Sequence, residues 1–418
     1  MISKAECLAL ICFAATNCAA QGTAAWQDPS PHTVRFVTVD KNVQLEVLDW
    51  GGSGRALVLL AGLGNTAHVF DEFAPKLTPA YHVYGITRRG HGLSSAPVSG
   101  YSADRLGDDV LAVIEALGLD RPVLVGHSVA GEELSSVGTR YPERIAGLIY
   151  LEAAYSYAYY DPSQGDLDID LLDLRRKLGQ LRASLPEPQF HVQDLRKKLK
   201  QLDSFNSPQD SGWRSLAQRL LLTDLPNLET ALQSLPRRAE GSPPLEKPSG
   251  EVQLVQELLQ TDLPGFERDL KDAQRNVPVE PPQPRVPAQT AADRATFSAL
   301  RSWEIRVQGF STPEAEMRQA YESGPNGRIG KARVWVTSDH ADDAILAGQQ
   351  KYTDIRVPVL AIYAVKTSGT ADDKAQTAFE TGVKGAHVVR LPHANHMIFL
   401  SNEADVLREM NAFLRSLP

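Results

Sequence analysis

Residues 123–131 read Val-Leu-Val-Gly-His-Ser-Val-Ala-Gly, and this stretch decides the fold. A short apolar run leads into a turn of small residues around Ser128, and helical spacing continues from Gly131. A serine in such a turn needs small neighbours, because the strand and the helix approach closely there. The second small residue is Ala130, where glycine is more usual. We therefore expect Ser128 to be a nucleophile in a strained strand-to-helix turn.

Strand-like and helix-like segments alternate on both sides of this turn. Continuous apolar runs are typical of strands buried on both faces, and apolar residues at helical spacing indicate amphipathic helices. The predicted strands are residues 43–50, 56–60, 83–86, 123–125, 145–151, 357–365 and 387–391. The predicted helices are residues 106–117, 131–141, 371–379 and 405–414. This alternation predicts an α/β fold with a doubly wound, mostly parallel sheet.

Two blocks carry the pattern, residues 33–154 and 351–418. The insertion between them, residues 155–350, is polar, rich in proline and contains charged segments with helical spacing. Five prolines between positions 278 and 287 predict an extended linker near residues 277–288. We expect one α/β core that is interrupted by a large, mainly helical insertion.

The composition is that of a globular protein, with 42% hydrophobic and 22% charged residues among 418. The net charge is −8 and no basic block stands out, which argues against a nucleic-acid or anionic-membrane partner. The three cysteines all lie within the first 18 residues. The rest of the chain therefore has no disulfide framework, thiolate zinc site or cysteine nucleophile.

Residues 1–20 have the features of a secretory signal peptide. Lys4 precedes an apolar run at residues 7–15, and the small residues Cys18 and Ala20 fit a cleavage site. The run is too short to span a bilayer, so we expect no stable membrane anchor. The alternative is a frayed apolar N-terminus on a cytoplasmic protein. We expect an exported chain, periplasmic or secreted, that is cleaved near Ala20.

Two histidines follow the last predicted strand, His393 and His396. A serine hydroxyl is a weak nucleophile and needs an adjacent base. Loops at the carboxyl ends of the strands line the ligand crevice of a doubly wound sheet. We expect His396 to be the base, because it lies further into the loop, and His393 to be a neighbour. The alternative for each is a surface or packing histidine.

These features together resemble the α/β-hydrolase superfamily. The resemblance rests on the turn at residues 126–130, on Ala-Asn-His at 394–396 and on Arg-Arg-Gly-His-Gly-Leu-Ser at 88–94, and it covers both core blocks. It implies a serine esterase that cleaves a small-molecule carboxylic ester through an acyl-enzyme intermediate, without a metal or an organic cofactor. It also implies that residues 155–350 form a cap over the active site.

The sequence offers two candidate positions for the acid of the catalytic triad. Family members usually carry it after the strand predicted at 357–365, where this chain has Thr367, with Asp372 and Asp373 only later. Glu152 ends another predicted strand, 24 residues after Ser128, and is similar in position to a glutamate in a branch of the haloalkane dehalogenases. Glu152 is our first choice and Asp372 or Asp373 the alternative. A structural salt bridge is the other interpretation of Glu152.

The resemblance also suggests an oxyanion hole and a substrate pocket. Ala61-Gly62-Leu63-Gly64 stands where the family often has His-Gly, and the donors by position are the backbone N–H groups of Leu63 and Val129. At the start of the insertion lie four tyrosines, which either line an aromatic pocket or pack. We expect these pocket residues: Tyr155, Tyr157 and His127.

Two other functions stay open. The first is hydrolysis of an amide or of a C–C bond by the same triad, since the pocket and not the fold sets specificity. The second is a non-catalytic ligand-binding protein on a hydrolase scaffold. The sequence leaves the substrate and the oligomeric state undetermined.

Overall fold

The computed structural model describes residues 26–166, 169–170, 172–173, 176, 287–333, 338–366 and 370–418. The predicted signal peptide, the charged segments between residues 177 and 286 that have helical spacing in the sequence, and almost all of the proline-rich linker lie outside these residues.

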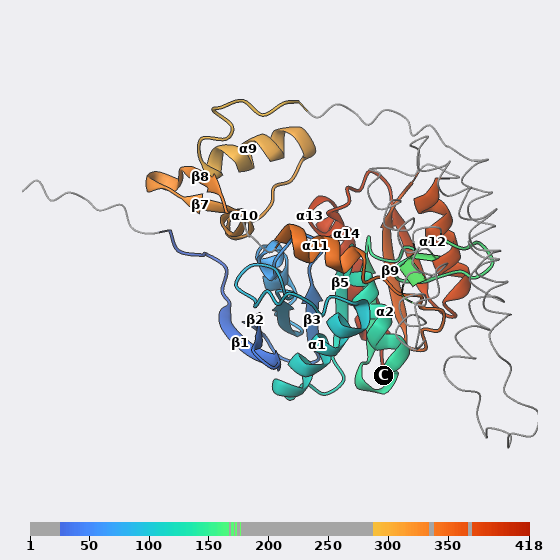
Figure 1. Ribbon diagram of the computed structural model, residues 1–418. Coiled ribbons are helices and arrows are strands. Elements are labelled where there is room, and N and C mark those ends of the chain that lie inside the picture. Colours follow the sequence, from blue (N-terminus) through green and yellow to red (C-terminus); the bar gives the residue numbers. More distant parts are fainter. Residues whose placement is uncertain are drawn as a thin grey trace, which may run out of the picture.

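The core is one eight-stranded sheet with the order β1-β2-β4-β3-β5-β6-β9-β10 (Figure 1). The first two strands pair antiparallel, and β2 runs antiparallel to β4. All other neighbours in this sheet are parallel, as the sequence predicts. The strands are β1 (Thr33–Asp40), β2 (Val43–Gly51), β3 (Ala56–Leu60), β4 (His82–Ile86), β5 (Val123–His127), β6 (Gly147–Leu151), β9 (Val359–Ala364) and β10 (His387–Leu391).

Helices cover both faces of the sheet. In β3, Val58 and Leu60 pack into one hydrophobic cluster, and Leu57 and Leu59 pack into another on the opposite face, as strand alternation requires. The first cluster includes residues of α1 (Ala103–Ala116), α2 (Ala130–Arg140) and α12 (Ala371–Gly382). The second includes residues of the short helices η1 (Ala67–Phe70) and η2 (Ala74–Lys76), and of α13 (Ile398–Ser401) and α14 (Glu403–Ser416).

The described part of the insertion contains helices and a small strand pair. Its helices are α9 (Phe297–Gln308), α10 (Glu314–Ala320) and α11 (Ser338–Leu346). The antiparallel strands β7 (Tyr321–Ser323) and β8 (Ile329–Ala332) were not expected from the sequence. Figure 1 shows α9, β7 and β8 grouped together at the edge of the molecule, whereas α11 lies close to the core.

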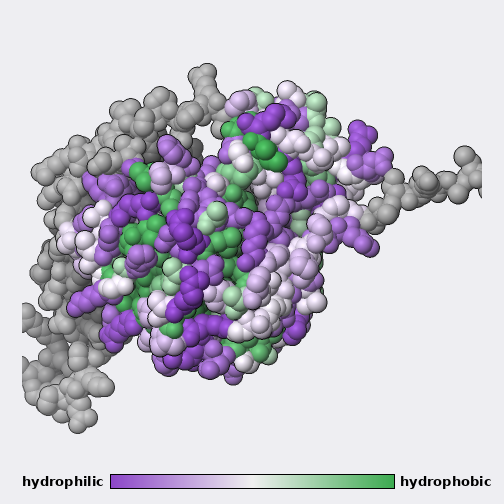
Figure 2. Space-filling view, turned by 180° about the vertical axis from the view of Figure 1, so that it is seen from behind, coloured by the Kyte–Doolittle hydropathy of each residue, from purple (hydrophilic) through white to green (hydrophobic). Residues whose placement is uncertain are grey.

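Hydrophilic residues cover most of the face shown in Figure 2, and hydrophobic residues appear there in smaller groups. None of the helices in the described ranges is long and apolar enough to cross a membrane.

Candidate active site

Ser128 occupies the turn between β5 and α2. Its φ angle is 53°, in the left-handed region that residues with a side chain rarely adopt. The Ser128 N–H donates to the Leu151 carbonyl (3.2 Å), and the Gly131 N–H donates to the Ser128 carbonyl (2.9 Å). Hydrogen bonds to β6 and α2 therefore hold the serine in the turn.

Close backbone approach explains the small residues around Ser128. A Cβ at Gly131 would lie 1.8 Å from the carbonyl oxygen of Ala153, just beyond β6. A Cβ at Gly126 would lie 2.9 Å from a methyl carbon of Leu134 on α2. Gly131 therefore has no room for a side chain, whereas the preceding position holds an alanine, Ala130.

His396 and Glu152 meet next to this turn. Nδ1 of His396 lies 3.4 Å from Oε2 of Glu152, and the His396 ring centroid lies 4.8 Å from that of His127, which precedes Ser128. The Glu152 side chain is fully buried, whereas half of the His396 side chain is exposed. A carboxylate only accepts hydrogen bonds, so Nδ1 of His396 carries the proton in this contact. Its Nε2 is then the nitrogen that can take a proton from a nucleophile.

Several groups besides His396 hold the Glu152 carboxylate. Oε2 accepts from the Tyr155 hydroxyl (2.7 Å) and lies 3.1 Å from Nζ of Lys366. Oε1 accepts a hydrogen bond from the Ala364 N–H. Burial raises the pKa of Glu152, but His396, Lys366 and the other two donors outweigh burial and hold this pKa below its ordinary value. Glu152 is therefore ionised at neutral pH.

The two alternative acids lie at the start of α12. Asp372 contacts Nζ of Lys366 (3.4 Å), and its side chain is half exposed. The Asp373 N–H donates to the Thr370 hydroxyl at the helix N-terminus (3.3 Å). Among the described residues, Glu152 is thus the carboxylate that lies against His396, and Asp372 contacts Lys366, which also contacts Glu152. The residue expected by position, Thr367, lies outside the described residues.

His127 is almost completely buried. Its Nε2 donates to the carbonyl of His396 (2.9 Å), because a carbonyl oxygen only accepts. Burial and the neighbouring His396 lower the pKa of His127 to about 3, so its ring is neutral. The contact that the structure shows is with the loop that carries His396, and the role of His127 in a substrate pocket stays a prediction.

The expected oxyanion donors, Leu63 and Val129, lie together. Their side chains belong to one apolar cluster that also includes Ala341 and Ile345 of α11. Within the described ranges, neither backbone N–H donates to another protein group. N–H groups that have no acceptor and lie beside Ser128 are what an oxyanion hole requires.

Buried Arg88 fixes the loop that leads into Leu63. Its guanidinium donates to both carboxylate oxygens of Glu133 on α2, at 2.6 and 2.9 Å. It also donates to the carbonyls of Ala61 (2.8 Å) and Gly62 (3.3 Å). The first residue of the 88–94 motif thus ties the loop after β3 to the helix after Ser128.

The insertion also holds this loop. Glu316 of α10 accepts hydrogen bonds from the Thr66 N–H (3.0 Å) and from the Asn65 side-chain amide (3.0 Å). On α11, Asp342 lies 2.8 Å from Nε2 of His91, within the 88–94 motif. The described end of the insertion therefore packs directly onto loops of the site.

The four tyrosines have different surroundings. Tyr155 donates to Glu152, as above. Burial and nearby carboxylates raise the pKa of Tyr157, while a hydrogen-bonding interaction with the Ser128 side chain acts against them. Tyr159 packs against Phe379, with ring centroids 6.1 Å apart, and Tyr160 donates to Asp170 (2.6 Å). Tyr155 and Tyr157 therefore lie at the site, and the other two pack beside it.

Sequence reasoning missed Lys366. This lysine follows β9 by two residues and lies against Glu152 and the Tyr155 ring. The sequence signal that could have identified Lys366 is its position just after a predicted strand. The carboxyl ends of the neighbouring parallel strands β6 and β9 meet at the same edge of the sheet, so residues that follow them lie close together.

Gly62 lies where the loop after β3 passes His127 and Ser128. A Cβ at this position would lie 2.8 Å from Nδ1 of His127 and 3.2 Å from Cβ of Ser128. We expect Gly62→Ala to destabilise the protein by about 1–3 kcal/mol, because the core is overpacked. We also expect it to lower any activity that depends on Ser128 by about 100-fold, because the groups around Ser128 are displaced. Urea unfolding and initial rates measure the two effects.

The control for this substitution is Gly324→Ala, whose Cβ would meet nothing closer than 3.3 Å. Wild-type stability and activity in Gly62→Ala would contradict the close packing described here.

Comparisons with known proteins agree with the fold. A family model described as "alpha/beta hydrolase fold" matches residues 55–244. In the solved structures, E-2-(acetamidomethylene)succinate hydrolase superposes with a TM-score of 0.50 at 15% identity, covering 92% of this chain and 99% of that one. Together with the sheet order, these matches show that the chain has the α/β-hydrolase fold.

Two curated relatives match shorter stretches. The 2-(acetamidomethylene)succinate hydrolase of Mesorhizobium japonicum is 28% identical over 101 residues, 24% of this chain and 36% of the relative. The bifunctional esterase/perhydrolase DCH of Acinetobacter calcoaceticus is 33% identical over 109 residues, 26% of this chain and 40% of the relative. The chain thus matches about two fifths of the length of these relatives.

Proposed function

We propose that this protein is a serine hydrolase that cleaves a carboxylic ester. The observation that supports the proposal is that Ser128 has a positive φ angle in the turn after β5, while His396, whose Nδ1 faces a buried, ionised glutamate, contacts the residue before it, His127. A nucleophile, a base and a group that orients the base are the three parts that this chemistry needs.

The proposed reaction has two steps. His396 Nε2 takes the Ser128 hydroxyl proton as Oγ bonds to the ester carbonyl carbon, and the Leu63 and Val129 N–H groups stabilise the oxyanion. The ester C–O bond then breaks, and His396 returns the proton to the departing alcohol. Water, deprotonated by His396, cleaves the acyl-enzyme and regenerates Ser128. Glu152 stabilises the imidazolium that forms in each step.

The nucleophile type supports an acyl-enzyme. Serine gives an acyl-enzyme with an ester, whereas the dehalogenase chemistry of some superfamily members needs an aspartate at this position, and this chain has Ser128. One of the curated relatives is named an esterase, and the matched stretch of 109 residues is consistent with such an activity here.

We further propose that residues 155–350 form a cap, with Tyr155 and Tyr157 in the substrate pocket. The contacts of Glu316 and Asp342 with loops of the site support this role. A cap excludes water and shapes the pocket. Export after cleavage near Ala20 is a separate proposal, which rests on residues 1–20 alone.

The test uses the full chain, a fluorophosphonate probe and a short-chain aryl ester. We expect covalent labelling of Ser128, located by mass spectrometry of peptides, and turnover of the ester. An anilide of the same acyl group distinguishes ester from amide cleavage. A folded protein that reacts with neither probe nor ester would overturn the catalytic proposal in favour of a ligand-binding protein.

A further inference from the structure

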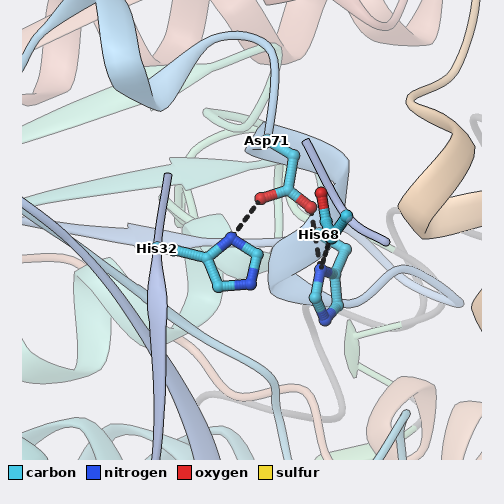
Figure 3. Close-up of side chains that lie close together, drawn as sticks. His32, His68 and Asp71 are labelled. Atoms are coloured by element: carbon cyan, nitrogen blue, oxygen red, sulfur yellow. Dashed lines mark hydrogen bonds and ion pairs between the residues drawn. The ribbon is translucent and has the colours of Figure 1, made fainter. Parts of the chain in front are cut away.

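Four metal-ligating side chains converge away from the proposed active site. Asp28 and His32 lie on the segment before β1, His68 lies in η1 and Asp71 directly follows η1. One ligand atom from each of the four residues lies within 4.8 Å of the others. Nδ1 of His32 is 2.9 Å from Oδ1 of Asp71, and Nδ1 of His68 is 2.8 Å from Oδ2 of Asp71. Figure 3 shows the Asp71 carboxylate between the two imidazoles.

Three of the four side chains are largely buried, Asp28 is 21% exposed, and part of the cluster lacks hydrogen-bond partners. The side chains of His32, His68 and Asp71 are 6%, 8% and 3% exposed. Nδ1 of His32 and Oδ1 of Asp71 are buried without a hydrogen bond, although the two atoms are close. Each of these two atoms can offer a lone pair, and they lie close together without the geometry of a hydrogen bond. Two ligands of one metal ion would be arranged in this way. Leaving such atoms buried and unsatisfied is costly.

The charges around the cluster also favour a cation. Among the residues that the structure describes, neither Asp28 nor Asp71 forms an ion pair with a lysine or an arginine. A third carboxylate lies on the far side of the His68 ring, where Oε1 of Glu46 is 3.8 Å from Nε2 of His68. One divalent cation would neutralise the charges of Asp28 and Asp71.

We propose that Asp28, His32, His68 and Asp71 bind one zinc ion. Two imidazoles and two carboxylates are a donor set that suits zinc in four-coordinate geometry. Tetrahedral zinc places ligand atoms about 3.3 Å apart, so the close pairs at 2.8 and 2.9 Å would open slightly and the widest separations, up to 4.8 Å, would close. Glu46 then supplies the carboxylate that orients a ligating histidine through its other nitrogen. A cleft of about 290 Å³, whose lining includes Asp28 and Asp71, gives the ion a route from solvent.

The site would act on structure and not on the hydrolytic step. It joins the segment before β1 to η1, and η1 follows the loop that carries Leu63. Binding to the folded chain alone would raise the thermal midpoint of unfolding as zinc is added.

The test measures zinc on the full chain without an affinity tag, by equilibrium dialysis against ZnCl₂ followed by elemental analysis. We expect one zinc ion per chain, loss of this ion in His32→Ala/His68→Ala, and about 10–100-fold weaker binding in Glu46→Gln. The control is His82→Ala, which removes a histidine that pairs with Asp49 elsewhere (2.9 Å) and should bind zinc like the wild type.

Two results would overturn the zinc site. One is a wild-type chain that binds less than one zinc ion, which would leave the cluster as contacts of the two histidines with Asp71 alone. The other is a double variant that keeps its zinc, which would place the ion at other residues. Because a double variant can fail to fold, Co²⁺ on the wild-type chain is a second measurement. Strong visible bands of tetrahedral Co²⁺ would support the site, and a weak octahedral spectrum would contradict it.

Discussion

Replacing Ser128 with alanine is expected to abolish fluorophosphonate labelling and to lower kcat on the aryl ester by about 10⁶-fold. The substitution removes the atom that forms the acyl-enzyme, so the other groups of the site have no covalent intermediate to stabilise. The Ser128 side chain is only partly buried in a turn that backbone hydrogen bonds hold, so the fold should persist. Active-site labelling, steady-state kinetics and circular dichroism of the variant check these three statements.

The matched control is Ser302→Ala, which removes a serine hydroxyl from the exposed α9, where it bonds to the Ser298 carbonyl. This variant should label and turn over like the wild type. Turnover that survives in Ser128→Ala at more than a trace would exclude the acyl-enzyme and require another nucleophile.

Replacing Glu152 with glutamine is expected to lower kcat by about 10⁴-fold and to change KM little. Glutamine has a similar shape but no charge, so it cannot stabilise the imidazolium of His396, and its amide group can hold the wrong tautomer. Asp372→Asn is the matched control, because Asp372 shares Lys366 with Glu152 but is half exposed. We expect Asp372→Asn to stay within about fivefold of the wild-type rate. The reverse ranking of the two variants would make Asp372 the triad acid.

Acid unfolding gives a readout of Glu152 that is independent of turnover. Its pKa is lowered in the folded chain from an ordinary value of 4.5. Its charge therefore stabilises the fold above that value, and this contribution is lost as the pH falls through the lowered pKa. Glu152→Gln should lose less stability than the wild type between neutral pH and the acid end of this range. An identical decline in both proteins would mean that the Glu152 pKa is not lowered in the folded state.

The core could be predicted from the sequence because its strands are buried on both faces. Such strands appear as continuous apolar runs, and β3 has the predicted bounds. The edge strand β10 also has the predicted bounds, although it is only partly buried. The strand β1 was not named, because all but two of its residues are exposed and it lacks an apolar run. The sheet order also places β6 beside β9, which gives the site its shape but has no signal in local periodicity.

The candidate site residues that could be predicted are those whose residue type and position after a strand indicate a chemical role. Ser128, His396 and Glu152 follow strand ends, and parallel strands bring those ends together. Lys366 and Arg88 were not assigned from the sequence, because an ion pair between distant segments leaves no pattern in either segment. The zinc cluster was missed for the same reason, since its residues come from two segments about 40 positions apart that a sequence pattern does not connect.

The pairing of β6 with β9 also has a consequence for the order of folding. Strand β6 ends at Leu151 and β9 begins at Val359, so roughly 200 residues must be synthesised between them. Contacts between residues so far apart in the sequence form slowly. At about 5–20 residues per second, the ribosome needs on the order of 10–40 s to synthesise this interval. Strands β1 to β6 can therefore assemble well before β9 and β10 are available. Ser128 and Glu152 belong to the early half and His396 to the late half, so a nascent chain is expected to gain activity only when the second half docks.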